Sequence, residues 1–176
     1  MIVTRHVILD SELPHAELSE TLRRAYARGD SNRLTDPLRA EGVDKLHFDL
    51  DDSGVFRITP VGLESGGGRS PRLAVEARVR VLPVPSGKAR LSVAVGVTRG
   101  SWLGVLTGPA IFGAFGVVQL LRDPPSFGSC YFLLGAAALV AGVGFLRARA
   151  LVERAWPGLE AIARRIATGS FYVPAA

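Results

Sequence analysis

The segment Asp49–Gly54 has the residue types and spacing that come closest to a metal site in this sequence. Aspartate, aspartate and serine occupy its first, third and fifth positions ahead of a glycine, as in the opening half of a calcium-binding loop. The twelfth position of such a loop holds a glutamate that closes the site, and here that position is Pro60. The same residues favour a tight turn between two strands, so we interpret them as a turn and predict no calcium site.

The three histidines, His6, His15 and His47, are the other candidate metal ligands. No pair of them has the spacing of a zinc site. His6 and His47 fall on the polar faces of predicted strands, where a solvated imidazole is the ordinary outcome. We therefore predict no metal site. The single cysteine, Cys130, excludes an internal disulfide framework.

A glycine-rich stretch at positions 64–70 lies beside two cations, Arg69 and Arg72, as a phosphate-binding loop would. It lacks the spacing of a Walker motif and does not lead into a helix, so we interpret it as a connection between strands. If this part of the chain binds a ligand, the two arginines are the candidate contacts and an anionic lipid headgroup is the expected partner. Because no nucleophile elbow or acid–base pair stands out, we predict no catalytic residue, no cofactor and no enzymatic activity.

Two apolar, charge-free stretches, 102–121 and 127–146, dominate the C-terminal half of the sequence. A helix of twenty residues rises about 30 Å, which matches the hydrocarbon core of a bilayer. Only five residues separate the stretches, so they predict a tight transmembrane hairpin. Transporters keep charged side chains at membrane depth, and these spans contain no Asp, Glu, Lys, Arg or His. The hairpin is therefore expected to be an anchor.

Small residues four positions apart lie on one face of each predicted span. They are Gly104 and Gly108 in the first span and Ala138 and Gly142 in the second. Such residues let two helix backbones approach closely in lipid. The partner is either the other arm of the same hairpin or, in a homo-oligomer, a second copy of the chain.

Basic residues predict the orientation of the hairpin. Lys88, Arg90 and Arg99 precede the first span and Arg147, Arg149 and Arg154 follow the second, whereas the connecting loop has one arginine beside an aspartate. By the positive-inside rule both termini are expected on the cytoplasmic side of the cell inner membrane. Arg99, Arg147 and Arg149 are further candidate contacts for anionic lipid headgroups.

Residues 1–100 have the patterns of an α+β head domain. Apolar and polar residues alternate over 1–9, 45–50, 55–59, 72–81 and 91–97, and a helical pattern covers 14–28. The order β-α-β-β-β-β predicts one antiparallel sheet of about five strands with one main helix on its apolar side. The expected domains are thus 1–100 for the head, 101–147 for the hairpin and 148–176 for a C-terminal helix and tail.

The C-terminal segment 148–176 contains a helix breaker, Trp156-Pro157. We expect the second span to continue to about residue 155 and a short amphipathic helix to run from Pro157 to just before Gly169. Its apolar face either lies on the inner leaflet or packs against the head. We favour packing, because the head has only one other long helix.

Charge and layout together suggest a function class. The net charge of +5 comes mainly from arginine, and because no arginine cluster is interleaved with aromatic residues we expect no nucleic-acid partner. The layout resembles that of small bacterial membrane proteins with an α/β head and a C-terminal hairpin. We predict a non-catalytic, membrane-anchored interaction or scaffold module, with membrane lipid and a protein or a second copy as partners. The alternatives are a lipid-binding or lipid-sensing module at the inner leaflet and, less favoured, a membrane-bound enzyme or transport subunit.

Overall fold

The structure is a computed structural model that describes residues 2–28, 38, 43, 45–50, 54–61, 64–65, 73–121 and 127–169. Along the chain the elements are β1 (Ile2–Pro14), α1 (His15–Arg28), β2 (Lys45–Leu50), β3 (Phe56–Val61), β4 (Glu64–Ser65), β5 (Leu73–Pro83), β6 (Lys88–Val97), α2 (Arg99–Leu120) and α3 (Phe127–Ala167). The predicted α+β class is confirmed, and the predicted order of elements holds apart from β4. This strand was not predicted, because two residues are too few to show an alternating pattern.

The main sheet is antiparallel, with the strand order β1-β6-β5-β3-β2, and β4 pairs separately with β5. The register places apolar residues opposite one another, for example Val79 of β5 between Phe56 of β3 and Val93 of β6. All three are buried. The predicted alternation is thus confirmed, and one face of the sheet forms the core. β1 is longer than the predicted 1–9, and Pro14 ends this strand instead of starting the helix.

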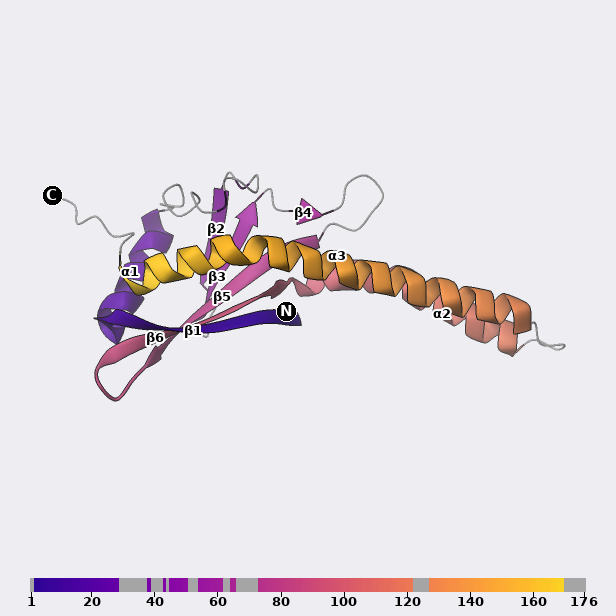
Figure 1. Ribbon diagram of the computed structural model, residues 1–176, viewed down its shortest axis with the longest axis horizontal. Coiled ribbons are helices and arrows are strands. Elements are labelled where there is room, and N and C mark those ends of the chain that lie inside the picture. Colours follow the sequence, from indigo (N-terminus) through magenta and orange to yellow (C-terminus); the bar gives the residue numbers. More distant parts are fainter. Residues whose placement is uncertain are drawn as a thin grey trace.

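Two helices cover the apolar face of the sheet. Leu18 and Leu22 of α1 and Leu159 and Ile162 of α3 are buried in the same cluster as the inward side chains of the strands. Figure 1 shows α3 running from the far end of the molecule back across this face. The packing of the C-terminal helical segment on the sheet, favoured over the inner leaflet, is therefore what the structure shows.

The predicted helix break at Trp156-Pro157 is wrong, because α3 is one continuous helix of 41 residues that passes through Pro157. A proline inside a helix removes the N–H that would bond the carbonyl four residues earlier, here that of Glu153. Pro157 and Glu153 are both exposed, so water can solvate that carbonyl. Leu159 and Ala155 are buried on either side, and their packing holds the helix together across the proline.

The core consequently joins residues from both ends of the chain. We use the word head for β1–β6, α1 and the part of α3 from residue 148 onward, whose buried side chains share one cluster. The hairpin is α2 together with residues 127–146 of α3. The Arg122–Ser126 connection of the hairpin lies outside the described residues.

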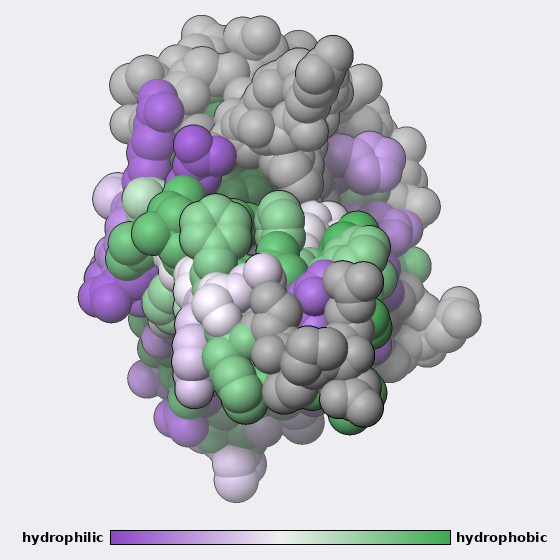
Figure 2. All heavy atoms as spheres, turned by 90° about the vertical axis from the view of Figure 1, so that its right-hand side faces the viewer, coloured by the Kyte–Doolittle hydropathy of each residue, from purple (hydrophilic) through white to green (hydrophobic). Residues whose placement is uncertain are grey.

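The two arms of the hairpin lie side by side and project away from the head (Figure 1). Both helices are long and apolar enough to cross a membrane, and only 11% and 6% of their most apolar stretches are buried. Viewed from the tip, hydrophobic side chains gather over the hairpin and hydrophilic ones lie mostly around the head behind it (Figure 2). A core helix of a soluble protein is mostly buried, so these two helices are far more exposed than such a helix.

Candidate membrane-boundary site

The first turn of α2 is bonded directly to the sheet. The backbone N–H of Thr98 donates to the carbonyl of Ala74 in β5 at 3.1 Å, and the N–H of Ala74 donates to Ser101 Oγ at 3.0 Å. The Thr98 hydroxyl caps the helix by accepting from the N–H of Ser101 at 3.4 Å. β6 therefore passes into α2 without a flexible linker.

α3 is attached to β1 at two points. Near its C-terminal end, the Ser11 hydroxyl donates to the carbonyl of Ala167 at 2.7 Å in a buried position. Closer to the hairpin, Arg5 forms an ion pair with Glu153 at 2.5 Å, and its guanidinium lies 5.7 Å from the centroid of the Trp156 ring. These contacts fix the position of the helix on the sheet.

The arms of the hairpin pack through glycines. A Cβ at Gly108 would lie 3.8 Å from Val140, one at Gly116 would lie 3.2 Å from Leu134, and one at Gly144 would lie only 2.4 Å from Val105 Cγ1. Gly116 and Gly144 were missed in the search for small residues four positions apart. The close approach at these two glycines depends on the bulky side chain opposite, which spacing within one helix does not show.

The other predicted helix-packing residues lie differently. Gly104 is half-buried, whereas Ala138 and Gly142 are exposed. A Cβ at Gly142 would meet nothing within 4 Å. Ala138 and Gly142 therefore do not make the close contact within the hairpin, and their use against a second copy stays a prediction.

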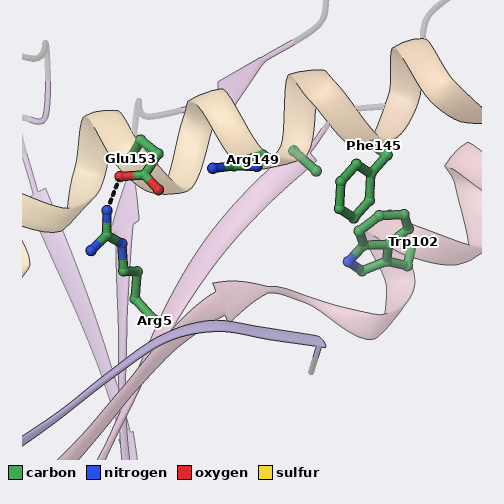
Figure 3. Close-up of a pocket in the computed structure, with 6 residues that line it drawn as sticks. Arg5, Trp102, Phe145, Arg149 and Glu153 are labelled. Atoms are coloured by element: carbon green, nitrogen blue, oxygen red, sulfur yellow. Dashed lines mark hydrogen bonds and ion pairs between the residues drawn. The ribbon is translucent and has the colours of Figure 1, made fainter.

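A pocket of about 390 Å³ opens where the hairpin joins the head. Its lining comes from three elements and consists of Arg5, Trp102, Phe145, Ala148, Arg149 and Glu153, which we call the boundary pocket. Figure 3 shows the Trp102 and Phe145 rings at one end and the Arg5–Glu153 pair at the other, with Arg149 between them. The two rings are tilted by 44° with their centroids 6.2 Å apart.

The boundary pocket contains an unsatisfied donor and an unpaired cation. Trp102 is 8% exposed, and its indole Nε1 is buried without a hydrogen-bond partner among the described residues. Arg149 is exposed, and it makes no ion pair with any other residue that the structure describes. Since Arg5 is neutralised by Glu153, Arg149 supplies the net positive charge of the pocket.

The structure brings together only part of the predicted headgroup contacts. Arg149 lines the boundary pocket, whereas Arg99 and Arg147 are exposed and do not line it. Arg69 and Arg72 lie outside the described residues. Arg5 was not predicted, although its odd-numbered position in β1 puts it on the same side as Val7 and Leu9 and so towards α3.

Among the described residues, no three His, Cys, Asp or Glu side chains lie close enough to hold a metal ion. His6 Nε2 lies 2.9 Å from Ser92 Oγ on the solvent side of the sheet. The lining of the boundary pocket supplies donors and one carboxylate instead of a nucleophile beside a base. No family model and no curated protein matches the chain.

Proposed function

We propose that this chain is a two-pass protein of the cell inner membrane whose head is a non-catalytic interaction module on the cytoplasmic side. The observation that carries the proposal is the double use of α3. Its first half exposes apolar side chains along the hairpin, and its second half supplies core residues such as Leu159 and Ile162 to the head. One helix thereby joins a membrane anchor to a folded domain.

Exposed apolar residues support the membrane placement. Large side chains on both arms are uncovered, among them Leu103, Phe115, Phe132 and Leu139, each more than half exposed. In water such a surface would be a large unpartnered apolar patch, whereas the hydrocarbon of a bilayer solvates it. Arg99, Arg147 and Arg149 lie where the arms enter the head, and the positive-inside rule puts that end in the cytoplasm.

The face of the sheet opposite α1 and α3 is the surface that the head offers to a partner. We call it the open face, and it includes His6, Ile8 and Asp10 of β1, Arg80 of β5 and Arg90 of β6. Ile8 is 53% exposed between charged neighbours. Protein interfaces have an apolar centre and a polar rim, and we propose Ile8 as the centre of such a contact.

Membrane insertion and topology are tested with cysteines placed in a Cys130→Ala background. We expect the full-length protein to stay in the membrane pellet after extraction at alkaline pH. A cysteine at Ser86, in the turn between β5 and β6, should react with a membrane-impermeant maleimide only after the inner membrane is opened. A cysteine at Ser126, between the two spans, should react in intact spheroplasts. Release into the supernatant, or the reverse labelling pattern, would contradict the proposal.

The interaction role is tested with a photo-crosslinking amino acid at Ile8 in cells. We expect a product of one defined mass that Arg80→Glu on the same face reduces. The matched control carries the crosslinker at Arg23, an exposed position of α1 on the other side of the sheet. Equal products at both positions, or none at Ile8, would argue against the open face as the contact surface.

A further inference from the structure

We propose that the boundary pocket binds the phosphate of one anionic phospholipid headgroup, with the Arg149 guanidinium and the Trp102 indole N–H as its donors. This inference rests on the membrane placement proposed above and adds a defined ligand site to it. The pocket lies at the junction of hairpin and head, which is the level of the lipid headgroups in that placement.

The indole of Trp102 is the first reason to expect an acceptor in the pocket. A buried donor without a partner costs free energy, so such groups are rare in folded proteins. Figure 3 shows the indole nitrogen on the side of the ring that faces Arg5 and Arg149. An oxygen of a ligand held by these arginines would therefore approach from the side on which the N–H is unsatisfied.

The charges of the pocket favour an anion over a cation. Its lining residues are two arginines and one glutamate, and the carboxylate of Glu153 already holds Arg5 at 2.5 Å. This pairing leaves Arg149 as the lining cation that has no ion-pair partner among the described residues, and it removes the glutamate as a ligand for an ammonium group. Guanidinium groups donate to phosphate oxygens in charge-assisted hydrogen bonds, often two at a time.

The ring end of the pocket selects a lipid over a small soluble anion. Phe145 is 49% exposed, and its neighbour Leu146 and the Trp102 neighbour Leu103 are exposed as well. The apolar wall thus continues onto the outer surface of the hairpin. A ligand that uses both ends must carry an anionic group next to hydrocarbon, as a phospholipid does.

The first test measures lipid retention by native mass spectrometry. Full-length protein is equilibrated in micelles of a mild detergent that contain equal amounts of phosphatidylglycerol and phosphatidylcholine. We expect one phosphatidylglycerol to be retained, and Arg149→Gln to weaken its binding about tenfold or more, as expected for the loss of a charge-assisted hydrogen bond. Arg147→Gln is the matched control, because it removes the same charge two residues away on α3 from a side chain that does not line the pocket.

The second test follows the indole N–H itself. The chain has two tryptophans, so the ¹⁵N-labelled protein should give two indole signals, which Trp156→Phe assigns. Titration with dihexanoyl phosphatidylglycerol should move the Trp102 proton signal downfield, and Arg149→Gln should suppress that shift. Inorganic phosphate is the parallel arm, and it should leave the signal unchanged at concentrations at which the lipid saturates.

Three results would overturn the inference. Equal weakening by Arg147→Gln and Arg149→Gln would show diffuse attraction to the basic boundary instead of a site. A response to inorganic phosphate equal to that of the lipid would identify a soluble anion as the ligand. No shift of the Trp102 signal at saturating lipid would exclude its N–H as a donor. Both tests are made in detergent, so they can be interpreted independently of the membrane-extraction and labelling experiments. Failure of those two experiments would overturn the proposed function, and it would not decide the outcome of the lipid tests.

Discussion

Gly144 is the glycine of the hairpin at which an added Cβ would meet the other arm most closely. Because an added Cβ would lie 2.4 Å from Val105 Cγ1, we expect Gly144→Ala to lower the free energy of unfolding in detergent by about 1–3 kcal/mol, the usual cost of overpacking. The measurement is an unfolding titration with sodium dodecyl sulfate. Gly142→Ala is the control, because its added methyl group meets open space and alanine is the better helix former.

One further variant and the outcome for the control make this prediction specific. Val105→Ala removes the methyl groups in the way and should restore most of the stability that Gly144→Ala loses. If Gly142→Ala destabilises the protein as much as Gly144→Ala, the arms are packed in another rotational setting than the one described.

Ser11 is a second residue whose substitution we expect to lower the stability of the fold. Its hydroxyl donates to the carbonyl of Ala167 and accepts from the N–H of Leu13, so Ser11→Ala leaves both groups unsatisfied in a largely buried place. We expect a loss of about 1–3 kcal/mol in the free energy of unfolding. Ser86→Ala in the exposed β5–β6 turn should change it by less than about 0.5 kcal/mol. Equal effects would show that the bond to Ala167 is not made in solution.

At the scale of elements, α3 depends on its helical phase. One alanine inserted after Arg147 would turn the following residues by about 100° relative to the hairpin. Leu151 and Leu159, now buried on the sheet, would then leave it unless the hairpin contacts gave way. We expect a large fall in the unfolding midpoint, measured by circular dichroism in detergent. One glycine inserted after Ser86 is the control, because exposed turns tolerate added residues.

The strands were predictable from the sequence because their burial is one-sided. Leu73, Val75, Ala77 and Val79 occupy alternate positions in the sequence, and all four are buried in the structure, although Glu76 between them is buried as well. The course of α3 through Pro157 was not predictable, because the tendency of proline to break a helix is outweighed here by the burial of the residues on either side. The boundary pocket was not predictable either, since its lining residues Arg5 and Arg149 lie far apart in the sequence.

At the scale of the whole molecule, the head is completed by a segment that follows the hairpin. We therefore expect residues 1–98 alone to associate through the uncovered face of the sheet and to show little protection from hydrogen exchange. Joining residues 148–169 after Thr98 through a short glycine–serine linker should yield a monomer with protected strands. The linker can be short, because Trp102 near the start of α2 lies beside Phe145 of α3. A monomeric, protected 1–98 fragment would contradict this prediction.

The uninterrupted course of α3 has a mechanical consequence. The helix passes from the hairpin into the core of the head with no joint, and α2 is bonded to the sheet beside it. With the hairpin in a bilayer, any change in its tilt turns the head through nearly the same angle. Helices tilt to match the thickness of the surrounding hydrocarbon. The direction in which the open face points would then change with the thickness of the bilayer.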